Sequence, residues 1–406
     1  MSGNSLWAKA VFILITLLAV QVASAADSKT LDHDVTIGVL TDMSSVYSDL
    51  VGAGSVLAAQ MAVDDFIKAQ HPDYKIHVIS ADHHSKAAVA SSIARDWIDK
   101  EGVNVITDVS GASVTLAVSA LGAQKNTLVL ATASGQTSLS GKDCQATTLH
   151  WTYNIPAVSG TTARVVTRQG KKNWFFLTAD YAGGDSMRDD AASAVKANGG
   201  KVIGSLSHPL GNRDFSSALL MTQDPKIDVV GLANAGNDTI NAIKQANEYG
   251  ITSQKTIVPL LMFITDVDTL GLEMTQDMYV TAPFYWGLNE STRAWSKRFL
   301  GEHGRMPTMV QAGLYSSVLH YLKAVDATGS TDTETVNRKM HEMPVNDMFV
   351  ENGRIRQDNL MVHNMYVFRI KKPSESQYPW DYYQLVETLS PEEAYLPLSK
   401  DCSLVK

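Results

Sequence analysis

The chain has 406 residues, which is too long for one ordinary domain and suits two or three. Apolar residues make up 45% of it and charged residues 19%, a globular composition that excludes disordered, collagenous and coiled-coil proteins. The formal charge is −8 and no basic cluster exceeds two adjacent residues, so a nucleic-acid partner is not expected.

The first 25 residues have the pattern of a secretory signal peptide. Lys9 is their only charge, residues 10–20 are apolar apart from Thr16, and residues 23–25 (ASA) supply small side chains at a cleavage site. An N-terminal membrane anchor is the alternative, but the apolar run is shorter than the ~20 residues that a span needs. We therefore expect a signal peptide at 1–25, cleavage after Ala25 and export to the periplasm.

Export places Cys144 and Cys402 in an oxidising compartment. Two free buried thiols are the alternative, but no other cysteine is present, so we expect a mutual disulfide. It would tie a C-terminal tail (387–406) to the first third of the chain. Two cysteines alone cannot build a four-ligand zinc site or an iron–sulfur site, and neither a metal nor a cofactor is expected.

The chain then alternates between short apolar runs and stretches with apolar residues at helical spacing. In the first part we expect strands at 35–40, 75–80, 102–107 and 127–132, and helices at 54–67, 86–100 and 113–123. After residues 154–156 the pattern starts again, with helices at 157–169, 182–198, 214–222 and 238–249, and strands at 173–178, 201–206, 227–232 and 257–262. Such alternation requires parallel sheets covered by helices on both faces, so the sequence predicts two doubly wound, Rossmann-like α/β lobes.

The last third differs. We expect a strand at 278–282, helices at 291–301, 310–327 and 333–343, and antiparallel strands at 354–356, 363–370 and 382–387. This segment has too little alternating material for a third lobe, so we expect it to return and complete the first two.

Enzymatic signatures are nearly absent. The pair Gly52 and Gly54 follows a strand, but Leu57 stands where the third glycine of a dinucleotide fingerprint belongs. No G-x-S-x-G nucleophile elbow is present. His83 and His84 could suggest a metal, but adjacent residues on an extended segment point apart, so a solvated loop is the better interpretation. An enzyme is not expected.

Two loops stand out instead. Ser110, Gly111, Ala112 and Ser113 follow one predicted strand and open a helix, and Ala133, Ser134 and Gly135 follow the next strand. Each loop offers free backbone N–H groups, small side chains and hydroxyls, which suit an anion at a helix N-terminus. Simple N-capping by Ser113 is the alternative. The pair of loops at one sheet edge indicates a carboxylate site.

Four motifs carry a family resemblance. They are residues 37–44 (IGVLTDMS), residues 62–66 (AVDDF), residues 180–184 (DYAGG) and residues 353–358 (GRIRQD). In this order and spacing the sequence resembles the leucine/isoleucine/valine-binding type of periplasmic substrate-binding protein that serves ABC importers (type I). The resemblance implies two α/β lobes joined by a three-crossover hinge, with the ligand in the cleft between them. Lobe 1 would comprise 32–153 plus 282–345, and lobe 2 would comprise 154–281 plus 346–386.

The resemblance also implies site residues. The two first-lobe loops would bind the ligand carboxylate, while Tyr47 from the first lobe and Tyr181 from the second would close over the ligand. Relatives that bind amino acids hold the ammonium with an acid after strand 227–232 or near strand 257–262. Asn234 follows the first of these strands, and Asp238 and Asp266 lie only a few residues away. A buried ammonium without a carboxylate partner is costly, so an amino-acid ligand is in doubt.

Aromatic residues gather at the predicted cleft edges. Trp151 and Tyr153 stand at the first crossover, Phe263 ends a second-lobe strand, and Phe284 and Tyr285 stand at the third crossover. Aromatic side chains mostly fill cores, which is the alternative for each of them. Their concentration favours a flat ligand. Residues 264–267 (ITDV) and 378–383 (YPWDYY) are also similar to a subgroup that takes up lignin-derived aromatic acids.

The sequence therefore predicts a monomeric periplasmic binding protein that delivers a small organic acid, an aromatic carboxylate, to an ABC permease. The alternative is a receptor, sensor or uptake protein for branched-chain amino acids or amides, and an exported enzyme comes third. The candidate ligand-binding residues are Tyr47, Ser110, Gly111, Ala112, Ser113, Ala133, Ser134, Gly135, Trp151, Tyr153, Tyr181, Asn234, Phe263, Phe284 and Tyr285.

Overall fold

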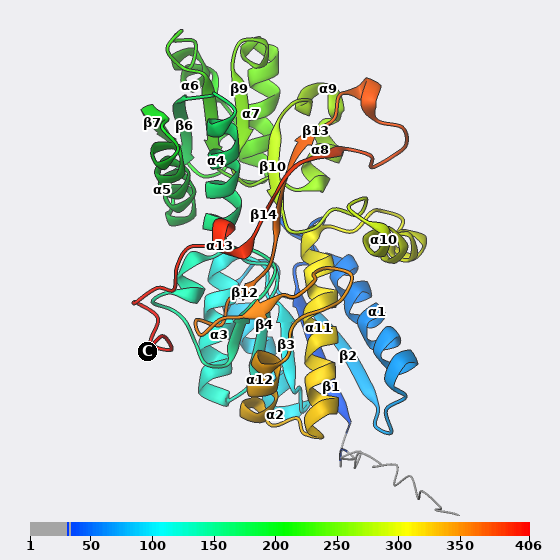
Figure 1. Cartoon of the computed structure of the whole chain (residues 1–406). Coiled ribbons are helices and arrows are strands. Elements are labelled where there is room, and N and C mark those ends of the chain that lie inside the picture. Colours follow the sequence, from blue (N-terminus) through cyan, green and yellow to red (C-terminus); the bar gives the residue numbers. More distant parts are fainter. Residues whose placement is uncertain (1–30, 32–33) are drawn as a thin grey trace, which may run out of the picture.

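The computed structural model describes Leu31 and residues 34–406, so the expected signal peptide lies outside the described residues. Two α/β lobes are stacked along the long axis of the molecule, as the sequence predicted (Figure 1). The largest hydrophobic core cluster includes residues of both lobes and of the segments between them. Among the described residues, no helix is both long and apolar enough to cross a membrane.

The first lobe contains a five-stranded parallel sheet in the order β2-β1-β3-β4-β5. Its strands are β1 (Val35–Thr41), β2 (Ile76–Asp82), β3 (Val105–Asp108), β4 (Leu128–Ala131) and β5 (Thr148–His150). The helices between them are α1 (Gly52–Gln70), α2 (Ala87–Lys100) and α3 (Ala112–Lys125), and η1 (Thr137–Ser140) is a 3-10 turn. All four residues of β3 and of β4 are buried, as expected of strands covered on both faces.

The second lobe contains a four-stranded parallel sheet in the order β7-β6-β8-β9. Its strands are β6 (Asn173–Ala179), β7 (Lys201–His208), β8 (Val229–Ala233) and β9 (Thr256–Pro259). The accompanying helical segments are η2 (Pro156–Gly160), α4 (Thr161–Arg168), α5 (Ala182–Ala197), α6 (Ser216–Met221), α7 (Asn237–Glu248), η3 (Ile251–Ser253), α8 (Ile264–Leu270) and α9 (Leu272–Thr275). The helix expected at 157–169 begins with the π-helical turn η2.

The last third returns to both lobes. It contributes α10 (Glu290–His303), α11 (Met309–Thr328), α12 (Thr333–Glu342), the 3-10 turn η4 (Pro373–Glu375) and α13 (Pro391–Ala394). An antiparallel sheet joins β10 (Tyr279–Ala282), β13 (Met365–Ile370) and β14 (Tyr383–Leu389), and β11 (Arg354–Ile355) pairs with β12 (Met361–Val362). Helix α11 packs against α1 in the first lobe, where Gln311 donates a hydrogen bond to the carbonyl of Val51 (3.1 Å).

The chain passes between the lobes after β5, after β10 and after β12, and the segment after β14 passes between them once more (Figure 1). The short β11–β12 hairpin was expected in the second lobe, but the turn between its strands is hydrogen-bonded to the first. The amide of Asn359 donates to the carbonyl of Gln145 (2.8 Å), and the backbone N–H of His150 donates to the carbonyl of Asn359 (2.8 Å). The remaining domain boundaries stay a prediction.

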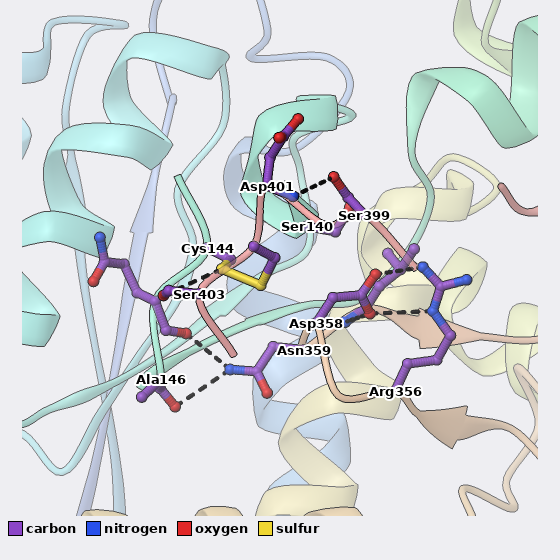
Figure 2. The surroundings of a disulfide bond; sticks show 12 residues. Ser140, Cys144, Ala146, Arg356, Asp358, Asn359, Ser399, Asp401 and Ser403 are labelled. Carbon is purple, nitrogen blue, oxygen red and sulfur yellow. Dashed lines mark hydrogen bonds and ion pairs between the residues drawn. A yellow bond between two sulfur atoms is a disulfide. The ribbon is translucent and has the colours of Figure 1, made fainter. Parts of the chain in front are cut away.

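The expected disulfide is confirmed. Cys144, in the segment before β5, is bonded to Cys402, 258 positions later (Figure 2). Around it, Asn359 contacts the carbonyls of Gln145 and Ala146. The C-terminal tail is thereby fixed to the first lobe.

Candidate functional site

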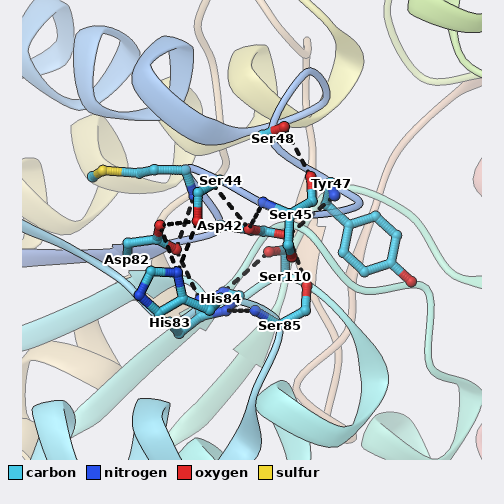
Figure 3. Close-up of polar contacts among 11 residues, drawn as sticks. Asp42, Ser44, Ser45, Tyr47, Ser48, Asp82, His83, His84, Ser85 and Ser110 are labelled. Atoms are coloured by element: carbon cyan, nitrogen blue, oxygen red, sulfur yellow. Dashed lines mark hydrogen bonds and ion pairs between the residues drawn. The ribbon is translucent and has the colours of Figure 1, made fainter.

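Loops after β1, β2 and β3 meet at the carboxyl edge of the first sheet (Figure 3). Asp42 holds two of them together: it accepts hydrogen bonds from the backbone N–H of Tyr47 (3.0 Å), the hydroxyl of Ser45 (2.7 Å) and the hydroxyl of Ser85 (2.7 Å). Burial raises the pKa of Asp42, but these hydrogen bonds outweigh it and lower the pKa to about 2. Asp42 is therefore charged at neutral pH and fixes the position of Tyr47.

The loop after β3 has an unusual backbone. Asp108 and Val109 have φ angles of 77° and 50°, and Gly111 has 88°. Two successive non-glycine residues in the left-handed region, one of them β-branched, are strained, and such strain concentrates at functional sites. Helix α3 begins directly afterwards with Gly111 at its N-cap, and no described side chain caps it. The alternative of capping by Ser113 is therefore wrong, and the N–H groups of the first turn are left available.

The loop after β4 lies beside it, and the backbone N–H of Gly111 reaches the carbonyl of Ala133 (3.4 Å). Ser134 is buried, and its carbonyl accepts a hydrogen bond from Nε2 of His150 (2.6 Å). A Cβ on Gly135 would lie 2.6 Å from the ring of Tyr153, so only glycine allows this close approach. The structure thus brings together the two loops that the sequence singled out.

Three tyrosines, from both lobes, adjoin these loops. The ring of Tyr47 lies 3.2 Å from where a Cβ on Gly111 would be, and the ring of Tyr181, from the turn before α5, folds over Gly183. Burial raises the pKa of Tyr153, and the charges of Tyr47 and Tyr181 raise it further, which places the three phenols near one another. Tyr47 and Tyr181 are 38% and 39% exposed and can contact a ligand.

An apolar pocket lies beyond the tyrosines. It is lined by Met262, Phe263, Ile264, Ala282, Phe284, Tyr285, Trp286, Pro307, Met309 and Tyr383. Tyr153 meets Phe263 edge-on, with ring centroids 6.4 Å apart, so the tyrosine group and the pocket wall are in contact. Most of the side chains of Phe284 and Tyr285 are nevertheless packed: Phe284 meets Trp295 edge-on, and the Tyr285 hydroxyl donates to the carbonyl of Trp380 (3.0 Å).

Two candidates are not brought to these loops. Trp151 is fully buried, and its indole N–H donates to the hydroxyl of Ser316 in α11 (3.2 Å), so it belongs to the first-lobe core. Asn234 is also fully buried: its amide contacts His208 (3.1 Å) and its carbonyl accepts from Thr239 (2.7 Å). Both side chains are therefore hydrogen-bonded within the protein. Ala112 and Ser113, by contrast, are exposed.

The two nearby acids differ in their pairing. Asp266 caps α8 by accepting from the backbone N–H of Phe263 (2.9 Å), and burial raises its pKa to about 6. Asp238 is 3% exposed, and its Oδ2 accepts from the backbone N–H of Gly211 (3.0 Å), whereas its Oδ1 has no hydrogen-bond partner among the described residues. Burial, then the charges of Tyr47 and Asp238, raise the pKa of Tyr181 to about 12. Asp238 is thus an incompletely paired acid near the tyrosines.

The interpretation of His83 as part of a solvated loop is wrong. Its side chain is fully buried and contacts the hydroxyl of Ser110 (3.1 Å), whereas His84 is exposed. No group of residues that could hold a metal ion is found in the described part of the chain. The only sequence signal was the position of His83 directly after a strand, at the same sheet edge as Ser110.

Comparisons with known proteins agree with this fold. The family model described as "Periplasmic binding protein" matches residues 34–376. A periplasmic binding protein from Burkholderia mallei is 42% identical over 92% of this chain and 99% of its own, with a TM-score of 0.85. A branched-chain amino acid ABC transporter periplasmic ligand-binding protein from Burkholderia xenovorans is 37% identical over 90% and 97%, with a TM-score of 0.85.

A solute-binding protein from Rhodopseudomonas palustris in complex with benzoate is 15% identical over 88% of this chain and 97% of its own, with a TM-score of 0.74. At that identity the similarity shows the fold alone. No curated protein sequence matches the chain.

Proposed function

The chain belongs to the periplasmic binding protein family, whose members are non-enzymatic solute-binding proteins of ABC transporters, and we propose that its ligand is a small aromatic carboxylate. Membership implies a periplasmic location. The ligand would be captured between the lobes by hinge closure and delivered to an ABC permease.

The proposal rests on one observation: the N-terminus of α3, which no described side chain caps, lies beside the buried hydroxyl of Ser110. The first-turn N–H groups of α3 and the hydroxyl of Ser110 lie at one loop. A helix N-terminus favours an anion through its free N–H groups and its dipole. Ser110 and Ser134 are buried whereas Ala112 and Ser113 are exposed, so a carboxylate bound here would be partly removed from water.

The aromatic surroundings support the rest of the proposal. Tyr47 and Tyr181 offer partly exposed rings from the two lobes, and the buried Tyr153 contacts Phe263 in the wall of the apolar pocket. A stacked or edge-on aromatic contact contributes about 0.5–1.5 kcal/mol beyond area burial. Two or three such contacts would favour an aromatic acid over an aliphatic one.

The test is calorimetric titration with benzoate, 4-hydroxybenzoate and cinnamate against leucine and valine. We expect the best aromatic acid to bind at least about a hundredfold more tightly than either amino acid, which corresponds to ~2.7 kcal/mol. Micromolar binding of leucine with no heat from any aromatic acid would overturn the proposal.

Branched-chain amino acids are the second candidate, and Asp238 is the observation that favours them. Its Oδ1, which has no hydrogen-bond partner in the part of the chain that the structure describes, and its proximity to Tyr181 suit an ammonium group. The relative from Burkholderia xenovorans carries a branched-chain amino acid description. If leucine binds, Asp238→Asn should weaken it at least about tenfold while leaving benzoate unaffected, because a charged hydrogen bond contributes about 1.5–3 kcal/mol.

A further inference from the structure

His83 has both ring nitrogens engaged in a fully buried position. The backbone N–H of Ser85 approaches Nδ1 (3.0 Å), and the hydroxyl oxygen of Ser110 lies 3.1 Å from Nε2 (Figure 3). A backbone N–H can only donate, so Nδ1 must accept, and a neutral ring then carries its proton on Nε2. Burial lowers the pKa of His83, which favours the neutral ring.

This arrangement fixes the direction of the Ser110 hydroxyl. Since Nε2–H donates to its oxygen, the hydroxyl proton must point elsewhere. His83 is the one hydrogen-bond partner of that hydroxyl in the described part of the chain. A buried hydroxyl proton without an acceptor is unfavourable, so a ligand oxygen would complete the arrangement.

We infer that His83 is a positioning residue: it holds Ser110 as a hydrogen-bond donor aimed at the ligand carboxylate. The inference rests on the proposed function, because it assigns the way in which that site presents its donor. His83 would not contact the ligand itself and would act on it through Ser110.

A chain of hydrogen bonds holds His83 in turn. Ser85 donates its N–H to His83 and its hydroxyl to Asp42 (2.7 Å), and Asp42 also fixes the loop of Tyr47. The chain Asp42–Ser85–His83–Ser110 therefore connects the loops after β1, β2 and β3. Asp42 therefore fixes the position of Tyr47 directly and that of the Ser110 hydroxyl through Ser85 and His83.

The first test needs no ligand. In protein labelled with nitrogen-15 histidine, long-range correlation spectra of the ring nitrogens at about pH 7.5 should show His83 with its proton on Nε2. The signal is assigned by its loss in His83→Gln. A ring protonated on Nδ1, or on both nitrogens, overturns the inference.

The second test is a double-mutant cycle measured by titration with benzoate and with leucine. For whichever of the two probes binds the parent, His83→Phe should lower the affinity about tenfold. In a Ser110→Ala background the same substitution should lower the affinity by less than about twofold, because its effect passes through that hydroxyl. His83→Gln can accept from Ser85 and donate to Ser110, so it should stay within about threefold of the parent. Thermal unfolding of each variant shows that it is folded.

The exposed neighbour supplies the matched control, since His84→Gln should leave binding unchanged. If the parent protein binds benzoate and His83→Phe costs the same in both backgrounds, the inference fails and the proposed function stands. If the parent binds none of benzoate, 4-hydroxybenzoate, cinnamate, leucine and valine, the proposed function fails, and the role of His83 in ligand capture fails with it.

Discussion

Arg305, just before α11, forms an ion pair with Asp268 of α8, with Nη2 3.4 Å from Oδ2. The same guanidinium pairs with Asp49 in the loop after β1 (3.4 Å) and lies over the ring of Trp380 (5.5 Å to the centroid). Asp268 also accepts from the hydroxyl of Tyr382 (2.6 Å). Arg305 therefore links a loop of the first lobe to a helix of the second.

Arg305→Gln should speed release of the bound ligand by about twofold to thirtyfold, because it removes two partly exposed ion pairs worth roughly 0.2–1 kcal/mol each. Stopped-flow dissociation, with the probe that binds in the titrations, measures it. Arg293→Gln is the matched control, since among the described residues Arg293 forms its one ion pair with Glu290 of its own helix (3.0 Å) and otherwise donates to the nearby carbonyl of Gly287 (3.1 Å). Equal effects of the two substitutions would contradict the interlobe role.

Removing the Ser110 hydroxyl should weaken the carboxylate probe about tenfold to a hundredfold, because a hydrogen bond to a charged group contributes about 1.5–3 kcal/mol. Ser110→Ala, Ser113→Ala and Ser134→Ala are compared by calorimetry. Ser113 is exposed at the first turn of α3, so its loss should cost less than that of Ser110. If all three variants bind as the parent does, the carboxylate lies elsewhere.

Asp108 should make the protein less stable as pH rises. Burial raises its pKa to about 7, from 3.8, so the folded state holds a proton that the unfolded state has lost. Stability from this group is complete below about pH 4 and falls as pH rises through 7. Asp108→Asn, compared with the parent by denaturant unfolding, should therefore gain more at pH 8 than at pH 5.

Asn tolerates the positive φ at this position, so the substitution introduces little new strain. Asp73→Asn on the exposed surface is the control and should show no such trend. An Asp108→Asn difference that is the same at both pH values would mean that the buried carboxyl is already ionised at pH 5.

Loss of the disulfide should lower the free energy of unfolding by about 2–4 kcal/mol. The double variant Cys144→Ser, Cys402→Ser avoids a free thiol, and denaturant unfolding measures it against the oxidised parent. Thiol titration of the denatured, unreduced parent should find no reactive thiol. Two reactive thiols per chain would show that the bond does not form in solution.

Burial on both faces explains why most of the fold could be predicted. Strands such as β8 are continuous apolar runs, and each alternates with a helix, so the two lobes follow from local sequence. Strand β5 was missed because its three residues, Thr148 to His150, form no apolar run; pairing with β4 buries them. The site was subject to the same limit, because contacts with other segments of the chain decide which of its side chains are buried.

The two donor loops were predicted because small and hydroxyl residues follow consecutive strands. The burial of Trp151 and Asn234 could not be predicted, since partners from α11 and from the end of β7 decide it. His83 was misread for the same reason: a polar side chain at a strand end is solvated unless another loop covers it. Ser85 and Ser110 cover this one.

The segment after β14 connects the hinge to the first lobe through the disulfide. Tyr395 contacts His363 (3.0 Å), the carbonyl of Leu396 accepts from Arg356 (2.7 Å), and Cys402 ends the segment at the disulfide. As the lobes separate, this fixed length of chain must span the widening gap, and an extended chain reaches only about 3.5 Å per residue. The disulfide should therefore limit how far the lobes open, and small-angle scattering should find the reduced protein more extended than the oxidised one.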